Sequence, residues 1–235
     1  MEELKIMYED NHVIVVLKPQ NVLSQGDETG DKSLLDMVKD YIKETYKKPG
    51  NVYVGLVHRL DRPTGGVMVF AKTSKAASRL TEQLKDKQFS KKYLAVVVGA
   101  PKYKASRLEH FLKKDELTNV VRVCSRTSDG AKQAILEYKN IKTLDKVSLL
   151  DIKILTGRSH QIRVQMSHEK TPVFGDVKYG GDTLAKGHNL ALWAYELSFT
   201  HPTTRKKMTF NCMPPTDLVP WNVFEKEILE KQKIQ

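Results

Sequence analysis

The stretch VHRLDRPTGGVMVFAKT, residues 57–73, decides the fold that this sequence predicts. Its apolar ends belong to two strands, expected over 53–59 and 67–71, and its middle is rich in residues that form turns. The stretch therefore predicts two neighbouring strands joined by a turn over 61–66.

Asp61 stands where the first of these strands meets the turn, between Arg59 and Arg62. Because a nearby opposite charge favours the ionised form of a carboxylate, Asp61 should stay charged and could serve as a nucleophile or a general base. The same segment also fits a structural aspartate that only bonds its own turn. On this segment alone, both interpretations stay open.

Residues 66–73, GVMVFAKT, come close to the glycine-rich loop that binds nucleotide phosphates. The segment is one residue short, however, and Ala71 stands where the second glycine belongs. Its apolar centre forms strands, whereas a phosphate-binding loop needs glycines with exposed N–H groups. We therefore expect no nucleotide site here, and the sequence contains no other cofactor motif.

Caps and apolar periodicity place four helices around this stretch. Ser33 can cap a helix over 33–46, because Asp36 follows three residues later as in a capping box. Ser74 and Ser159 are expected to cap two more helices. A last amphipathic helix should follow the final prolines, with its apolar face formed by Phe224, Ile228 and Leu229.

Runs of β-branched and aromatic residues predict further strands. These strands are expected over 12–17, 93–98, 147–155, 190–199 and 207–212. Helices and strands mix without a strict strand–helix–strand alternation. This order predicts one α+β domain over residues 1–235, built on a mixed or antiparallel sheet with flanking helices.

Residues 101–134 differ from the rest, with eight Lys or Arg against four Asp or Glu and weak periodicity. Long loops or a protruding ribbon are expected there, as an element that could hold RNA. A solvated hairpin without a function explains the same composition.

A second polar stretch, GRSHQIRVQ at residues 157–165, surrounds a predicted helix start. Arg163 could reach a carboxylate from elsewhere and bind it through two hydrogen bonds. Arg158 and Arg163 could also be surface residues, and His160 could be a structural histidine. No spacing of His, Cys or acidic residues indicates a metal site.

The charge of the chain points to a polyanionic partner. The formal net charge of the 235 residues is +11, which suggests nucleic acid, although a basic surface without such a partner is also possible. The two cysteines, Cys124 and Cys212, lie far apart in the sequence and fit a reducing cytoplasm. No apolar run has the length of a signal peptide or a membrane span.

Taken together, these segments resemble the RluA-type family of RNA pseudouridine synthases. The similar segments follow the family's order: IMYEDNHVIVVLKPQNVLS at 6–24, the catalytic motif VHRLDRPTGGVMVFAKT at 57–73, the tyrosine motif KKYLAVV at 91–97, the arginine motif LTGRSHQIRVQM at 155–166, GDVKYG at 175–180 and LALWAYELSFTHP at 190–202. The catalytic and arginine motifs are the specific ones.

The resemblance implies a pseudouridine synthase fold and a cofactor-free, metal-free isomerisation of uridine in loops of ribosomal or transfer RNA. Asp61 would be the carboxylate that attacks the uridine, at C6 of the base or C1′ of the ribose, unless it promotes a glycal route. Tyr93 would contact the uracil, and Arg163 would pair with Asp61. Arg59 would fill the space that the flipped nucleotide leaves, and Leu192 would close over the base. Further substrate contacts are implied for His58, Arg62, Arg158, His160 and Gln161.

The chain also departs from the family pattern. Gly65 stands where the family usually has serine, and Gln165 where it often has histidine. The first strand starts close to Met1, so we expect no S4-type RNA-binding domain before it, and a monomer that captures RNA with its own basic surface.

Two other functions stay as alternatives. The basic segment 101–134 would also suit an RNA chaperone without activity, which would keep its effect on RNA after Asp61→Asn. A nucleotide-dependent enzyme would be stabilised by ATP or GTP.

Overall fold

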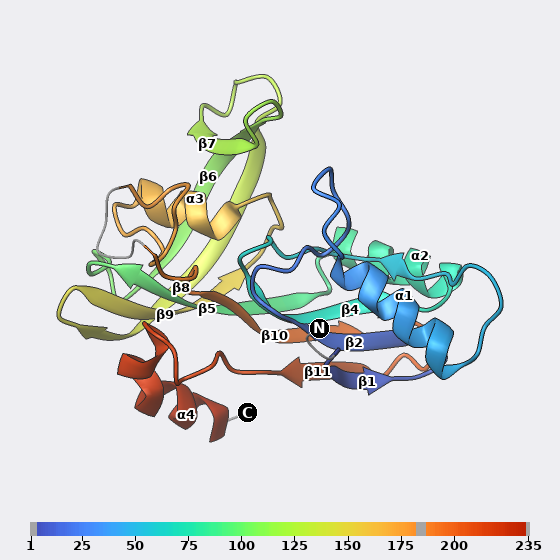
Figure 1. Cartoon of the computed structure of the whole chain (residues 1–235). Coiled ribbons are helices and arrows are strands. Elements are labelled where there is room, and N and C mark those ends of the chain that lie inside the picture. Colours follow the sequence, from blue (N-terminus) through green and yellow to red (C-terminus); the bar gives the residue numbers. More distant parts are fainter. Residues whose placement is uncertain (1–3, 182–186, 234–235) are drawn as a thin grey trace. The chain divides into compact units, whose positions relative to one another are not determined.

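The computed structural model describes residues 4–181 and 187–233, and the chain divides into two compact units (Figure 1). Unit 1 comprises Met1–Ser90 and Ala194–Cys212, and unit 2 comprises Lys91–Trp193 and Met213–Gln235. Of the helices in the described parts of the chain, none is both long and apolar enough to cross a membrane.

Unit 1 is a sheet with two helices beside it. Its elements are β1 (Ile6–Glu9), β2 (Val13–Lys18), α1 (Leu34–Thr45), β3 (Gly55–Leu56), β4 (Gly65–Ala71), α2 (Ser74–Lys85), β10 (Leu192–Thr200, in this unit from Ala194) and β11 (Lys207–Asn211). The strands follow the order β1-β2-β4-β10, with β11 beside β10 and β3 beside β4. Pairs β1–β2, β2–β4, β3–β4 and β10–β11 are antiparallel.

Alternation along the strands builds the core of unit 1. Val13 and Val15 of β2 lie on the same face as Val67 and Val69 of β4, and Leu80 of α2 packs against them. These five side chains are at most 1% exposed. Apolar burial of this kind is the main favourable term in folding, and it fixes β4, the strand that follows the turn at Asp61.

The capping box at Ser33 is confirmed, because its side chain accepts a hydrogen bond from the Asp36 N–H. The prediction for Ser74 is wrong, since Thr73 caps α2 by accepting from the Ala76 N–H at 3.2 Å. Thr73 still has extended backbone angles, whereas Ser74 is already helical. An N-cap must stay outside the helix for its oxygen to reach the first free N–H groups.

The strand expected over 53–59 shortens to Gly55–Leu56. The chain then leaves the sheet because Leu60 has another partner: its N–H donates to Ser24 Oγ at 3.1 Å, and its carbonyl accepts from the same hydroxyl at 2.7 Å. A side chain thus replaces the strand neighbour just before Asp61.

Unit 2 contains an antiparallel sheet in the order β5-β9-β8-β6-β7. Its elements are β5 (Ser90–Val98), β6 (Ala105–Asp115), β7 (Val120–Cys124), β8 (Lys132–Leu144), β9 (Val147–Ile154), α3 (Gln161–His168), the 3₁₀-helix η1 (Trp221–Phe224) and α4 (Glu225–Lys233). The ribbon expected within 101–134 is confirmed as the hairpin of β6 and β7, with α3 next to it (Figure 1).

Two predictions of local structure in unit 2 are wrong. Ser159 does not cap α3, because His160 stands between them with a left-handed backbone (φ 51°) and itself occupies the N-cap position. Phe224 belongs to η1 and Ile228 to α4, and both are buried, whereas Leu229 is 42% exposed because it lies on the outer side of α4.

Candidate active site

The turn that carries Asp61 is held by hydrogen bonds to each of its backbone carbonyls. Asp61 itself is half-buried. The donors are Ser24 Oγ to Leu60 O (2.7 Å), the Thr64 N–H to Asp61 O (2.9 Å), Lys18 Nζ to Arg62 O (3.0 Å) and Thr64 O (2.8 Å), and Gln20 Nε2 to Pro63 O (3.0 Å). Side chains from the end of β2 and from the segment after it therefore fix the backbone on both sides of the carboxylate. Preorganisation of this kind is what a reacting group requires.

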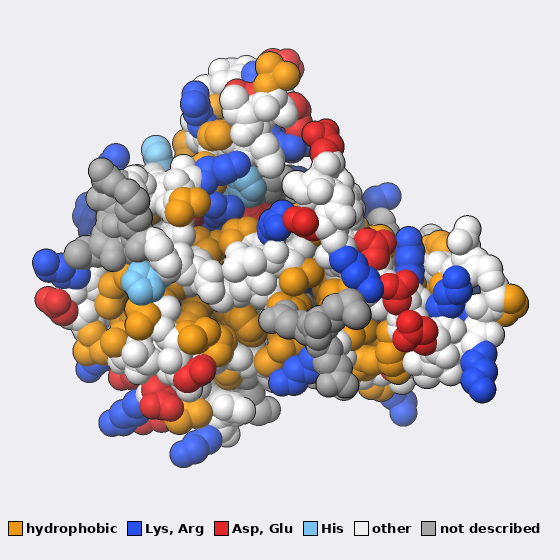
Figure 2. Space-filling view, in the orientation of Figure 1, with side chains coloured by type: hydrophobic (Ala, Val, Ile, Leu, Met, Phe, Trp, Pro, Cys, Tyr) orange, Lys and Arg blue, Asp and Glu red, His pale blue; other side chains and the backbone are white. Residues whose placement is uncertain are grey.

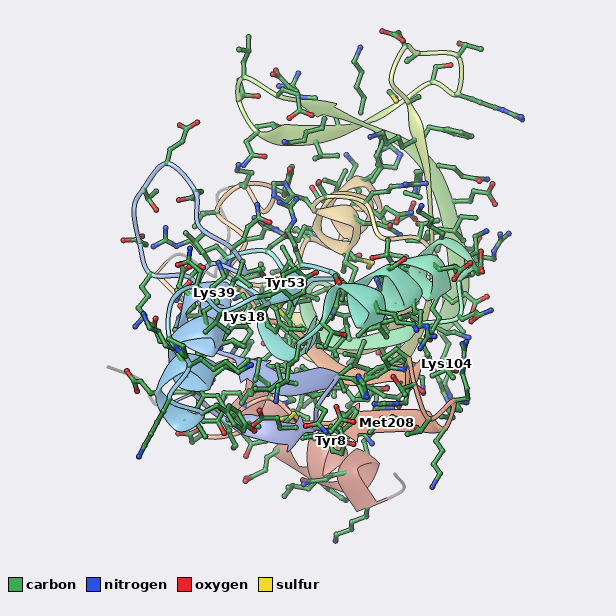
Figure 3. The ribbon with its side chains drawn as sticks, turned by 90° about the vertical axis from the view of Figure 1, so that its right-hand side faces the viewer. Tyr8, Lys18, Lys39, Tyr53, Lys104 and Met208 are labelled. Atoms are coloured by element: carbon green, nitrogen blue, oxygen red, sulfur yellow. The ribbon has the colours of Figure 1, made fainter. Side chains whose placement is uncertain are left out.

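Lys18 is the centre of this arrangement and lies inside unit 1 (Figure 3). Its side chain is fully buried, and its ammonium also donates to the Pro19 carbonyl at 2.9 Å. Burial lowers the pKa of Lys18 to about 7, the negative charge of Asp61 opposes this shift, and Arg62 adds to it. Three carbonyl acceptors match the three donors of an ammonium group.

The three predicted substrate contacts beside Asp61 have different surroundings. Arg59 is exposed. Arg62 is also exposed, but its guanidinium is held by the Asn21 carbonyl at 3.1 Å and by Asp31 at 2.6 Å. His58 is buried, and its Nε2 accepts from the Val69 N–H at 3.2 Å. A contact between these residues and a substrate stays a prediction.

In unit 2, Arg163 and Asp176 form a buried ion pair. Arg163 Nε donates to Asp176 Oδ2 and Nη2 donates to Oδ1, both at 2.8 Å. The two side chains are 6% and 0% exposed, and the Arg163 guanidinium also lies over the ring of Tyr179. The expected bidentate bond of Arg163 to a carboxylate is thus present with Asp176, while its pairing with Asp61 stays a prediction.

The loop before α3 is held by its own side chains. Gln161 Oε1 accepts from the Arg158 N–H at 3.0 Å and from Thr156 Oγ1 at 2.8 Å, while its Nε2 donates to the Ile135 carbonyl at 3.0 Å. His160 Nδ1 lies 2.6 Å from the Tyr179 hydroxyl. The buried Gln161 amide stabilises the loop through these hydrogen bonds. Substrate contacts of Arg158, His160 and Gln161 stay predictions.

Tyr93 and Leu192 both lie in unit 2. Tyr93 stands in β5 opposite Ile152 of β9 and is 6% exposed. Leu192 is the first residue of β10 and is 4% exposed. The burial of these two side chains is compatible with a role in core packing and also with contact to a uracil that enters from outside. Their roles in substrate binding therefore stay predictions.

Sequence reasoning missed Lys18 and Asp176 as functional candidates. Each lies in a segment on which the resemblance was based, Lys18 in the Lys-Pro turn and Asp176 in GDVKYG. For Lys18 the available signal was its place at the end of the apolar run of residues 13–17, directly before a proline. In the described ranges, no group of three His, Cys, Asp or Glu side chains could hold a metal ion.

Comparison with known proteins identifies the family. A sequence model described as RNA pseudouridylate synthase matches residues 12–168. The chain is 35% identical over 198 residues to ribosomal large subunit pseudouridine synthase D of Borreliella burgdorferi, covering 83% of this chain and 60% of that protein. It is 34% identical over 234 residues to the protein of that name from Xanthomonas campestris pv. campestris, covering 92% and 67%. The chain thus spans about three fifths to two thirds of the length of these relatives.

Solved structures agree with the fold. Human RNA pseudouridylate synthase domain containing 4 superposes with a TM-score of 0.76 at 24% identity, covering 92% of this chain and 90% of that one. Human RNA pseudouridylate synthase domain containing 1 gives a TM-score of 0.72 at 25% identity, covering 94% and 87%. The expected α+β pseudouridine synthase fold is confirmed.

Proposed function

Because the chain belongs to the RNA pseudouridylate synthase family, we propose that it converts uridine to pseudouridine in ribosomal RNA, with Asp61 as the catalytic carboxylate. The observation that carries the proposal is the turn at Asp61, in which each carbonyl from Leu60 to Thr64 accepts a hydrogen bond. Ribosomal RNA is favoured because the relatives carry it in their names. Transfer RNA is the alternative substrate.

The reaction breaks the C1′–N1 bond, turns the detached uracil and joins C1′ to C5. The hydrogen on C5 leaves as a proton and N1 takes up a proton, so the product is an isomer of uridine. In the proposal Asp61 attacks the uridine, at C6 or C1′ or by promoting a glycal. Tyr93 stacks on the base, which stabilises it by roughly 1–3 kcal/mol. Arg163 keeps Asp61 ionised, which opposes the rise in pKa that a dry pocket would cause.

The target base must leave its stack, which costs a few kcal/mol and is least costly in single-stranded loops. Arg59, exposed beside Asp61, would fill the vacated space. The two free thiols, Cys124 and Cys212, are compatible with a reducing compartment, so the proposal places the enzyme in the cytoplasm. A single catalytic domain that acts as a monomer is part of the same proposal.

Carbodiimide mapping of pseudouridine in total RNA tests this proposal. Cells that lack the gene should lose a defined site, which wild-type protein restores and Asp61→Ala does not. Asp86→Ala is the matched control, because Asp86 is an exposed aspartate of unit 1 that follows α2. Restoration by Asp61→Ala would exclude this carboxylate, and an unchanged map would contradict the activity.

A further inference from the structure

Lys91, the second residue of β5, has a half-buried side chain with an unusual environment. Burial lowers the pKa of its ammonium group. Within residues 4–181 and 187–233, the ammonium has no hydrogen-bond acceptor and no acidic partner. A desolvated cation without a partner is costly, and groups perturbed in this way cluster at functional sites.

The other buried cations show what Lys91 lacks. Lys18 donates to three carbonyls, and Arg163 binds both oxygens of Asp176. Both are satisfied within the protein, so neither needs an external anion. Lys91 differs because burial disfavours its charged form, and no residue in the described ranges provides an oxygen in return.

The position of Lys91 indicates which ligand it meets. Lys91 and Tyr93 are two residues apart in β5, so their side chains leave the same face of the strand, about 7 Å apart. Tyr93 is the residue that the proposed function places on the target uracil. A cation this close to the base lies within the span of one nucleotide, and the only anion that a uridine in RNA carries is its backbone phosphate.

The loop at Gly157 passes close to this ammonium. A Cβ built on Gly157 would lie 3.5 Å from Lys91 Nζ, whereas the glycine itself is exposed and has no side chain there. Gly157 belongs to the loop that leads to α3 and Arg163, so the loop passes Lys91 with a bare backbone. A larger residue would fill the space through which a phosphate oxygen approaches.

We infer that Lys91 binds a backbone phosphate of the RNA next to the target uridine and so positions the nucleotide on Tyr93. This inference rests on the proposed function. It makes Lys91 a substrate-positioning residue rather than a catalytic one. Replacing it should therefore raise the KM and the Kd for RNA and leave kcat nearly unchanged.

The test uses a stem–loop RNA that carries the mapped uridine, with one phosphate at a time replaced by a neutral methylphosphonate. For the wild type, the replacement at one linkage beside the uridine should weaken binding about 10- to 100-fold, the usual effect of losing a hydrogen bond to a charged group. Lys91→Met should bind the unmodified RNA more weakly by a similar factor and be insensitive to that same linkage. Lys91→Arg should recover most of the affinity.

Controls separate this effect from general electrostatics and from misfolding. Lys153→Met removes an exposed lysine from β9 and should leave the sensitivity to each linkage as in the wild type. Gly157→Ala should reduce the effect of the same methylphosphonate without removing any charge. Lys91→Met should also unfold at a higher temperature than the wild type, because it removes a desolvated charge, whereas loss of a structural lysine would lower that temperature.

The outcomes distinguish the two proposals. If the wild type converts the uridine and Lys91→Met keeps the full sensitivity to every linkage, Lys91 binds no phosphate and only this inference fails. If the wild type does not convert the uridine, the proposed function fails and this inference fails with it.

Discussion

At the scale of single residues, the two buried charged groups, Lys18 and the Arg163–Asp176 pair, are the strongest features. Each takes its partners from a distant part of its own unit. Such groups are expensive to bury, and removing one partner of a buried pair costs about 3–5 kcal/mol because the other is left uncompensated. Lys18 contacts the turn at Asp61 and Arg163 belongs to the arginine motif, so these groups hold the geometry of the segments that carry the proposed site residues.

Lys18 should make the stability of the protein depend on pH. Its pKa is about 7 in the folded chain, against an ordinary value of 10.5 in the unfolded chain. Between these values the unfolded chain binds more protons, so the free energy of unfolding should rise with pH, while below about pH 7 the full cost of the buried ammonium remains. Urea unfolding at several pH values measures this slope.

Lys18→Met should lose that slope. At pH 9 the variant should also be less stable than the wild type by about 1–3 kcal/mol, because carbonyls of the turn at Asp61 lose their hydrogen-bond donor. Lys75→Met is the control, since Lys75 is an exposed lysine of α2. A wild-type slope that survives in Lys18→Met would assign the effect to another group.

At the scale of elements, the hairpin of β6 and β7 combines a conventional inner face with an unfavourable outer one. Leu112 and Val121 pack on Val164 of α3 on the inner side. On the outer side Lys113 stands directly opposite Arg122, and both are exposed. The hairpin also carries acidic and hydrophobic side chains (Figure 2). Among the latter, Leu117 is 99% exposed. Like charges directly opposite each other destabilise a pair of strands, so this pair fits contact with a polyanion.

Arg122→Glu should therefore have opposite effects on stability and on RNA binding. The free energy of unfolding should rise by about 0.2–1 kcal/mol, because Lys113 acquires an opposite charge as its cross-strand neighbour. RNA affinity should fall, as measured by fluorescence anisotropy, and more than in Lys142→Glu, a charge reversal at an exposed position of β8 away from the hairpin. Equal losses of RNA affinity in Arg122→Glu and Lys142→Glu would mean that the hairpin does not contact the RNA.

The elements also show where sequence reasoning succeeded. The β-branched runs and the capping box at Ser33 predicted β2, β4, β9 and α1 to within a few residues, because these signals are local. The strand expected over 53–59 was too long, because Ser24 replaces its neighbour from 36 positions away in sequence. Lys18 before a proline looked like a surface lysine, and the partner of Arg163 depends on a contact that no local pattern contains. The motifs thus supplied the candidate residues of the site, whose roles stay predictions, and tertiary contacts decided how these residues are held.

At the scale of the whole molecule, the net charge of +11 is the feature that concerns RNA most directly. Charge of this kind adds affinity that does not depend on sequence and weakens with salt. We expect log Kd for the stem–loop to rise linearly with the logarithm of salt concentration. Each lost phosphate contact should reduce the slope by about 0.7.

Binding measured between 50 and 200 mM salt tests this expectation. Lys91→Met and Arg122→Glu should each give a shallower dependence of log Kd on the logarithm of salt concentration than the wild type. A double variant should combine the two reductions, because the residues lie on different elements, β5 and β7. Affinity that does not change with salt would show that the basic surface takes no part in binding.

The division of unit 1 into two separate stretches of chain has a consequence for biosynthesis. Its core takes Leu197 and Phe199 from the second stretch, and β4 has β10 as its neighbour on one side. A ribosome releases the chain from the N-terminus at about 5–20 residues per second. The first 90 residues therefore wait for Ala194–Cys212 to emerge, with one edge of β4 open to wrong pairing. Unit 2, most of which is continuous from Lys91 to Trp193, can fold during that wait, so of the two units the one whose synthesis begins earlier should be completed later.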